Sequence, residues 1–423
     1  MSTQLHANLT DDQVRQISSD LEEPEWLLET RLEALAALDD LDMPDVIRTP
    51  GRDWTNLYAL DFEELVDPLN AAEDKELIGD DEIVVSSLAE ALADDEYAQI
   101  VHEHFGSIVD PQENYLTALS TALFSSGTFV YVPEGVDAED VTIRTEMNSR
   151  SLFNYTLVVA EESSSVTILE RQYSGSADQG SADSRAAEPR DETVDDDRYY
   201  SAIVEVAAGE NANVQYGWLQ NLDEDTYNYT LKRGDADTYA TINWIEGNIG
   251  SRLTKSAVET ELNGSGSESQ IVGAFFGHED QHFDINSRVW HRNEHTTADL
   301  VTRGVTDDIA RSVYEGVQDV GRDAWDTSSY QRENTLMLSD ESEADASPKL
   351  IINNHDTEAS HSATVGQIDQ EDLLYMTSRG ISPRAARNML VEGFFVPVLD
   401  EIAVDELRED LEDLVAARLR KRD

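Results

Sequence analysis

Apolar residues recur at intervals of three and four near the start of the chain. This spacing predicts an amphipathic helix over residues 24–39, with Pro24 at a position where the first helical turn tolerates proline. Residues 83–125 show a similar spacing, and we expect helices there as well. The two segments indicate an N-terminal helical region over residues 1–125. The apolar positions of the first helix are Leu28, Leu32, Leu35 and Leu38.

From residue 126 onward the apolar period becomes extended. Segments 157–169, 204–216 and 231–242 share one plan, in which a strand, a small polar bend and a second strand follow one another. Units of this size cannot bury their own faces, and no helices separate the strands. We therefore expect a mainly β fold, a right-handed parallel β-helix over residues 126–366. A β-sandwich is the alternative, although the Asn-Gly and Asp-Gly turns typical of sandwich hairpins are rare here.

Residues 174–197 interrupt the strand pattern. This segment is rich in Ser, Gly, Ala and Asp, and Val194 is its one large apolar residue. Such a segment buries too little apolar surface to fold by itself. We expect a mobile acidic insertion that interrupts one coil of the β-helix without ending it.

The pattern after residue 366 is helical again. Asp369 can cap a first helix, and Arg379 stands in its last turn before Gly380, which can adopt the left-handed conformation that ends a helix. Ser382, followed by proline, then begins a second helix, which predicts an αα-hairpin within a C-terminal helical domain over residues 367–423. A later apolar stripe is expected to pack within its own domain rather than in a coiled coil. The stripe consists of Val404, Leu407, Leu411 and Leu414.

The charge of the chain excludes several classes of partner. With 88 acidic and 30 basic residues, the formal net charge is -58. Its field repels nucleic acids and anionic membranes. A hydrophobic content of 39%, with 15 Tyr and 6 Trp, still supplies a folded core. Self-repulsion of this size is tolerable where concentrated salt shortens the screening length, so we expect the cytoplasm of a halophilic archaeon.

The absence of cysteine limits the available chemistry. No disulfide, thiolate zinc site or cysteine nucleophile can form, and any metal ligand must be His, Asp, Glu or backbone. The sequence also contains no Walker-A loop and no Gly-x-Ser-x-Gly elbow. It shows neither an apolar run long enough to cross a membrane nor a signal-peptide pattern, and we expect a cytoplasmic protein.

Two short strings match zinc-peptidase motifs. The first reads H-E-x-x-H with His278, Glu279 and His282, and the second reads H-x-x-E-H from His291 to His295. Such motifs work on a helix, where residues four apart can share one zinc ion. The residues from Phe283 onward alternate as in a strand, which separates the same residues too widely. A zinc hydrolase using His278, Glu279 and His282 stays open as an alternative.

The candidate for chemistry is His361, within the stretch Ser-His-Ser-Ala-Thr-Val-Gly. A histidine among Ser and Thr is by itself more often structural. The stretch, however, resembles the C-terminal signature of the SufB/SufD family of iron–sulfur assembly scaffolds, in its SufD-like form. The resemblance extends over nearly the whole chain. It includes the Glu-Pro-Glu-Trp opening helix, the Gly127 to Gly135 segment, Tyr330-Gln331 with Asn334-Thr335-Leu336, and the terminal motif.

The resemblance implies a non-catalytic scaffold subunit that pairs with a SufB-like subunit and binds a SufC-like ATPase. It implies that His361 lies at the interface where a transient iron–sulfur cluster is built, as a metal ligand or a proton carrier, with the thiolates supplied by the partner. Two residues depart from the family pattern, because Ala359 stands where many relatives have cysteine and Ser362 where many have glycine. The ATPase would dock on the helical hairpin, through Asp369, Leu373, Leu374, Tyr375, Arg379 and Gly380.

The exposed end of a β-helix would also allow a homodimer of the isolated chain. An acidic β-solenoid with a purely structural role is the remaining alternative.

Overall fold

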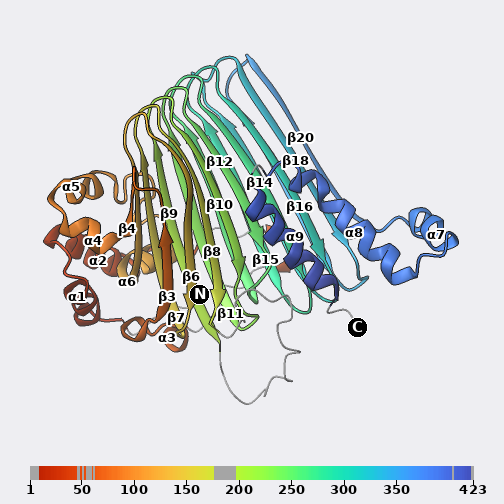
Figure 1. The fold of residues 1–423 in the computed structure, drawn as a ribbon, viewed down its shortest axis with the longest axis horizontal. Coiled ribbons are helices and arrows are strands. Elements are labelled where there is room, and N and C mark those ends of the chain that lie inside the picture. The colour runs from red at the N-terminus through yellow and green to blue at the C-terminus, as the bar shows by residue number, and fades with distance from the viewer. Residues whose placement is uncertain are drawn as a thin grey trace.

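Two long parallel sheets dominate the computed structural model, which describes residues 9–44, 48–49, 52–53, 60, 62–175, 197–402 and 404–420 (Figure 1). The strands form a parallel β-solenoid of about 8 turns, with helices at both ends of the chain. One sheet has the order β20-β18-β16-β14-β12-β10-β8-β6-β3, and the other the order β19-β17-β15-β13-β11-β9-β7-β5-β4. Each coil therefore contributes one strand to each sheet, which confirms the predicted β-helix and excludes the sandwich.

The solenoid strands are mostly 9 to 11 residues long and pair in parallel with those of the adjacent coils. The strands are β5 (Ser126–Val132), β6 (Asp137–Met147), β7 (Ser151–Ala160), β8 (Ser165–Ser174), β9 (Arg198–Ala208), β10 (Asn213–Asn221), β11 (Thr226–Ala236), β12 (Thr241–Asn248), β13 (Leu253–Leu262), β14 (Glu268–Gly277), β15 (His282–His291), β16 (Thr297–Thr306), β17 (Arg311–Val320), β18 (Thr327–Met337), β19 (Glu343–Ile352) and β20 (Thr357–Gln367).

Several of the polar bends between strands share one backbone conformation and one hydrogen bond. Asn211, Tyr239 and His295 stand in three of the bends on one edge of the solenoid, and each has a positive φ near 60°. Each donates its backbone N–H to a carbonyl oxygen in the bend of the next coil, over 2.7 to 3.0 Å. The bends are therefore stacked by hydrogen bonds in the same way as the strands, which keeps the coils in register.

The N-terminal region caps the first coils. Its helices are α1 (Asp11–Asp20), α2 (Glu25–Ala37), α3 (Phe62–Leu65), α4 (Leu88–Ala93), α5 (Asp95–His104) and α6 (Tyr115–Leu123), with a 3-10 turn at Pro68–Asn70. The helix predicted over residues 24–39 is confirmed as α2. A two-stranded ribbon, β1 (Arg48–Thr49) and β2 (Arg52–Asp53), lies in the same region.

The expectation of helix throughout residues 83–125 was wrong at its beginning. Strand β4 (Val84–Ser87) pairs antiparallel with β5, and β3 (Glu73–Ile78) pairs antiparallel with β6. Ser87 forms a capping box with Glu90, so α4 cannot begin earlier than Leu88. The residues before the cap are extended and complete the edge of the sheet.

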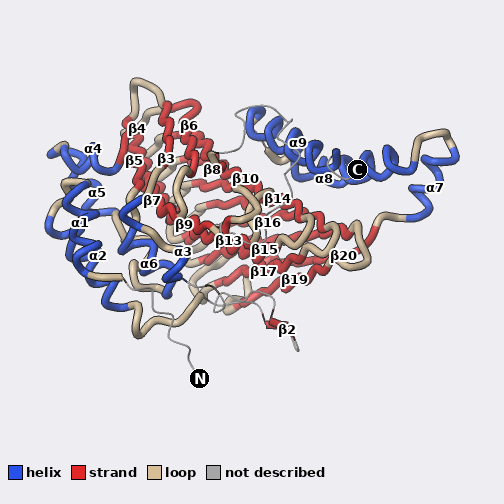
Figure 2. Tube along the Cα trace, turned by 90° about the horizontal axis from the view of Figure 1, so that it is seen from below, coloured by secondary structure: helices blue, strands red, loops and turns tan. Residues whose placement is uncertain are grey.

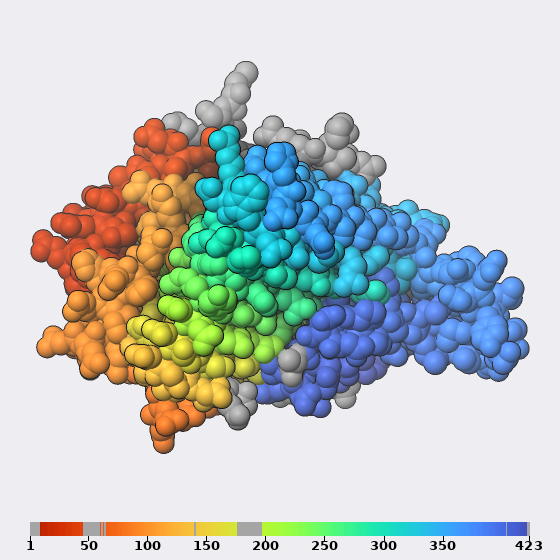
Figure 3. Space-filling model, turned by 90° about the horizontal axis from the view of Figure 1, so that it is seen from above, coloured from red at the N-terminus to blue at the C-terminus, as the bar shows by residue number. Residues whose placement is uncertain are grey.

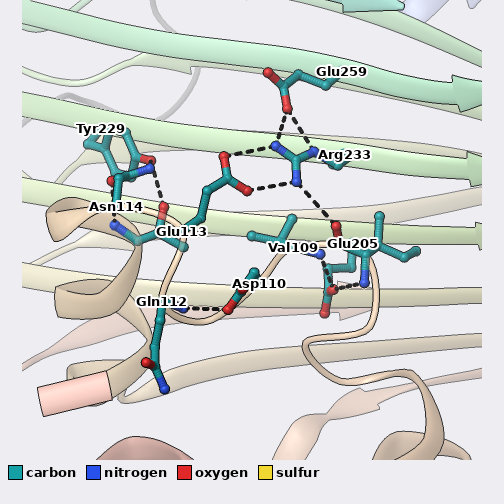
Figure 4. A network of polar contacts seen from close by, with 11 residues as sticks. Val109, Asp110, Gln112, Glu113, Asn114, Glu205, Tyr229, Arg233 and Glu259 are labelled. Atoms are coloured by element: carbon teal, nitrogen blue, oxygen red, sulfur yellow. Dashed lines mark hydrogen bonds and ion pairs between the residues drawn. The ribbon is translucent and has the colours of Figure 1, made fainter. Parts of the chain in front are cut away.

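Buried polar contacts fix the loop between α5 and α6 on the outer face of the second sheet (Figure 4). Glu205 of β9 accepts hydrogen bonds from the backbone N–H groups of Ile108 and Val109, at 2.9 and 2.8 Å. Arg233 of β11 bridges Glu113 of the loop, at 2.7 Å, and Glu259 of β13. Burial raises the pKa of Glu205. The backbone donors around it hold the loop in place.

The three C-terminal helices are α7 (Gln370–Ser378), α8 (Pro383–Leu399) and α9 (Asp405–Arg420). Helices α8 and α9 lie across the outer face of the first sheet, whereas α7 projects beyond the last strands (Figures 1 and 2). The apolar stripe that begins at Val404 was expected to pack within its own helical domain. It also packs against the sheet. Its core joins helix to sheet and includes Leu169, Leu219, Ile245, Val391, Phe395, Leu407, Leu411, Val415 and Leu419.

The predicted insertion lies almost wholly outside the described residues, since only Ser174, Gly175 and Asp197 of it belong to them. Within the described part of the chain, no helix combines the length and the apolar character that a membrane span requires.

Candidate functional site at the open end of the solenoid

The two ends of the solenoid differ. At the N-terminal end, the antiparallel strands β3 and β4 and the first helices cover the coils. At the other end the sheets finish with β19 and β20, and no further strand pairs with them among the described residues. The exposed edge of a sheet carries unpaired backbone N–H and C=O groups, to which another chain can bind. Three apolar residues are also exposed on these strands, namely Ile351, Ile352 and Val365.

His361 lies in the middle of β20, the last strand of its sheet. Its register partner is Gln331 of β18. Paired residues of parallel strands point to the same face, and Gln331 faces the interior of the solenoid. A Cβ placed on Gly316 of β17 would lie 1.6 Å from Nε2 of Gln331, so the Gln331 side chain reaches across to the opposite sheet. His361 therefore faces the interior axis, yet it is exposed because no coil covers it.

The two departures from the family pattern have distinct positions. Ala359 pairs with Ser329, on the same inward face as His361. Ser362 pairs with Arg332, which is exposed on the outer face. The hydroxyl of Ser362 is therefore directed away from the face that carries His361, and Ala359 puts only a methyl group beside it.

Polar side chains line the interior directly below His361. Ser329, Gln331, Glu333 and Thr335 are the inward residues of β18, and all four are buried. One oxygen of Glu333 accepts a hydrogen bond from Thr335, whereas the other has no partner among the described residues. Burial raises the pKa of Glu333 to about 7.

This polar row was not predicted as part of the site, although the sequence contains a signal for it. Ala298 and Leu300 occupy the matching inward positions of β16 beside Ser329 and Gln331. The change from apolar to polar at alternate positions of one strand is visible in the sequence alone. In the sequence, Gln331 belongs to the family resemblance and carries no predicted role of its own.

The predicted partner-binding residues lie on and beside α7. Asp369 caps this helix by accepting the Glu371 N–H at 2.7 Å, and Gly380 adopts φ +89° where the helix ends. Leu374 and Tyr375 are 69% and 59% exposed. The other two predicted residues are Leu373, which is half-buried, and Arg379, whose guanidinium lies 4.6 Å from the ring centre of Tyr375.

The hairpin of α7 and α8 forms a lobe at one end of the molecule, as Figure 3 shows. Large apolar side chains exposed on such a lobe are suited to anchor a partner. The hairpin and the open end are thus two separate candidate surfaces.

The first zinc string does not form a zinc site. His278 and Glu279 lie in the bend before β15, and His282 is the first residue of that strand. The single group of three close metal-binding side chains in the described residues consists of Glu224, His278 and Glu279, without His282. Arg418 of α9 already occupies that group. It forms an ion pair with Glu224 at 3.2 Å and donates a hydrogen bond to His278 Nε2.

The second zinc string is also structural. His291 is buried, and its ring contacts the Thr296 hydroxyl at 2.9 Å and the Gln318 amide oxygen at 3.1 Å. Burial lowers the pKa of His291 to about 4, so the ring is neutral at physiological pH. His295, by contrast, is exposed and pairs with Asp326. The strand geometry expected from the alternating sequence is thus confirmed, and the zinc hydrolase alternative loses its site.

The open end can contribute imidazole, carboxylate and amide groups to a cargo, but no thiolate, because the chain contains no cysteine. Clusters of iron and sulfur are normally held by thiolates. A cluster at His361 therefore requires ligands from another molecule.

Comparison with known proteins gives matches along most of the chain. Residues 142–394 match the model described as "SUF system FeS cluster assembly, SufBD core domain", and residues 65–143 match "SufBD protein N-terminal region". The iron-sulfur cluster assembly protein SufD of Bacillus subtilis is 30% identical, with 96% of this chain and 97% of the relative covered. SufB of the same organism is 28% identical over 94% of this chain and 90% of its own length. An iron-sulfur cluster assembly SufBD family protein of Staphylococcus epidermidis is 27% identical over the same shares.

Proposed function

Because the chain belongs to the SufBD family of the SUF system for iron–sulfur cluster assembly, we propose that it is a SufD-type scaffold subunit. In this role it is non-catalytic, pairs with a SufB-type subunit and binds a SufC-type ATPase. The transient cluster is the cargo that the complex builds and releases. The net charge of -58 supports the further proposal that the complex works in the salt-rich cytoplasm of a halophile.

The observation that carries this proposal is the position of His361. It faces the axis of the solenoid from the last strand, at an end with unpaired edges. A partner that covers this end would contact the exposed imidazole of His361. Since this chain lacks cysteine, the partner supplies the thiolates and His361 supplies a nitrogen ligand or a proton. The same surface would also allow a homodimer of the isolated chain.

The hairpin supports the ATPase part of the proposal. Leu374 and Tyr375 are exposed on α7, away from the solenoid core. Helix α8 continues from this hairpin onto the sheet, where Val391 and Phe395 are buried against it. A force on α7 is therefore transmitted through packed side chains to the strands of the solenoid. An ATPase that moves the hairpin would act on the coils close to His361.

Co-purification tests the proposed function. The full chain is expressed with SufB-type and SufC-type proteins of a salt-adapted organism, under anaerobic conditions and in concentrated salt. We expect a complex of all three, which elutes as one species in size-exclusion chromatography. If the chain elutes alone or as a homodimer in the presence of both proteins, the proposed function is wrong.

A further inference from the structure

Two buried side chains beneath His361 lack the partners that buried polar groups normally have. One carboxylate oxygen of Glu333 has no hydrogen-bond partner among the described residues, and the Gln331 amide has none there other than the Tyr314 hydroxyl beside it. Each residue is only 1% exposed. A buried polar group with too few partners destabilises the fold unless water or another molecule binds to it, so these two side chains are candidates for binding a ligand.

Both residues lie on β18, the strand directly beside the one that carries His361. Gln331 is the register partner of His361, and Glu333 is the register partner of Ala363, two residues further along β20. Adjacent strands lie about 4.8 Å apart. The amide and the carboxylate therefore lie one coil below the imidazole, on the same inward face.

The last coil places small side chains above them. Ala359 and Ala363 stand over Ser329 and Glu333 on one sheet. On the opposite sheet, Ala344 and Ala346 of β19 stand over Ser312 and Tyr314. Directly above Glu333, β20 therefore carries only the methyl group of Ala363, and His361 is the next inward residue along the strand.

We propose that Gln331 and Glu333 act with His361 to hold ferrous iron at the open end of the solenoid. An imidazole nitrogen, a carboxylate oxygen and an amide oxygen form a donor set suited to this borderline divalent cation. The site loads the metal before a partner's thiolates complete the cluster. This inference rests on the proposed function, because iron is cargo only for an assembly scaffold.

The environment of Glu333 is consistent with such a role. One of its oxygens accepts a hydrogen bond from Thr335, and the other, which has no partner among the described residues, can bind a cation. The described part of the chain places no basic side chain in an ion pair with Glu333, and a buried carboxylate usually requires a cation. The bound iron supplies that positive charge.

The test measures ferrous iron binding to the full chain, anaerobically and in concentrated salt, with excess Mg²⁺ to occupy the surface carboxylates. Bound iron is determined by equilibrium dialysis, and ⁵⁷Fe Mössbauer spectra report its ligands. We expect Glu333→Gln and His361→Ala each to weaken iron binding at least about tenfold. Glu315→Gln is the matched control, because Glu315 lies on the outer face of β17 in the same coil and pairs with Lys349.

Three outcomes are informative. A loss of iron in Glu333→Gln but not in Glu315→Gln, with unchanged thermal unfolding, supports the site. Equal binding by the wild-type chain and Glu333→Gln overturns it, as does equal loss in the control. The proposed function is judged separately by co-purification, since Glu333→Gln is expected to join the three-protein complex like the wild-type chain.

Discussion

Gln331 and His361 are register partners on the last two strands of one sheet, and both face the interior of the solenoid. One is buried, whereas the other is exposed. The difference arises because β18 has a strand on both sides, whereas in the described ranges of the chain β20 is paired on one side only. A residue that would be a core residue in any earlier coil is thus presented at the surface.

The buried carboxyl of Glu333 predicts a pH dependence of stability. Its pKa is about 7 in the folded chain against 4.5 for an ordinary glutamate, so the folded state keeps a proton that the unfolded chain has lost. Stability from this group is present at low pH and declines as the pH rises from 4.5 to 7, by about 3 kcal/mol. Urea unfolding at pH 5 and pH 8 should show this decline in the wild-type chain and not in Glu333→Gln. Parallel pH profiles of the two proteins would refute the assignment.

A second prediction concerns the lysine inside the solenoid. Lys232 is fully buried, pairs with Glu246 at 3.3 Å, and lies over the Trp218 ring. Burial lowers the pKa of Lys232 and raises that of Glu246. Lys232→Met leaves a buried carboxylate without its cation and is expected to reduce the free energy of unfolding by about 3–5 kcal/mol.

Two controls define this experiment. Lys349→Met removes a half-exposed lysine that pairs with Glu315, and should cost no more than about 1 kcal/mol. Lys232→Met combined with Glu246→Leu should recover part of the loss, because the unpaired charge is then absent. A loss below about 1 kcal/mol in Lys232→Met would mean that the pair is not buried in solution.

The contact between α9 and the sheet can be tested at a glycine. A Cβ on Gly217 would lie 2.6 Å from a methyl carbon of Leu407 and 3.1 Å from one of Leu169. Gly217→Ala should therefore push α9 outward at a cost of about 1–3 kcal/mol, and amide hydrogen exchange in residues 405–420 should accelerate. Gly393→Ala is the control, since nothing lies within 4 Å of that position. Unchanged exchange in α9 of the Gly217 variant would contradict the packing.

Docking of the ATPase on the hairpin gives a further prediction. Leu374→Asp places a charge at the most exposed apolar residue of α7, and should weaken binding of the SufC-type protein at least about tenfold. Because the side chain is exposed, the thermal unfolding temperature should not change. Ile309→Asp, in a bend where Ile309 is 51% exposed, is the control. Surface plasmon resonance measures both, and equal affinities would remove the hairpin from the interface.

The fold was largely predictable because strand alternation and bend positions are local features. Residues 157–169 already contain the end of β7, the bend with Ser163 at positive φ, and the start of β8. Burial of charge was not predictable in this way. Arg31 of α2 is fully buried by Glu23 and by the carbonyl oxygen of Ala122, and the latter contact depends on a residue far away in sequence.

The C-terminal helices also show a feature that the local sequence did not predict. Proline usually interrupts a helix, yet α8 contains Pro397 and continues to Leu399. The loss of one backbone hydrogen bond near the end of a helix is tolerated where the apolar face is buried, as Val398 is against the sheet. At the site, the role expected for His361 came from the family resemblance of the stretch that forms β20. The polar row of β18 required knowledge of which residues face inward.

The central claim is that His361 takes part in building the cluster, and anaerobic cluster reconstitution on the purified three-protein complex tests it most directly. Iron and sulfide content and the visible absorption of the cluster are measured for wild type, His361→Ala and His355→Ala, where His355 is an exposed histidine in the bend before β20. We predict that the His361→Ala complex assembles but accumulates about a tenth of the wild-type cluster or less, whereas His355→Ala matches wild type. Wild-type cluster content in an intact His361→Ala complex would contradict the account.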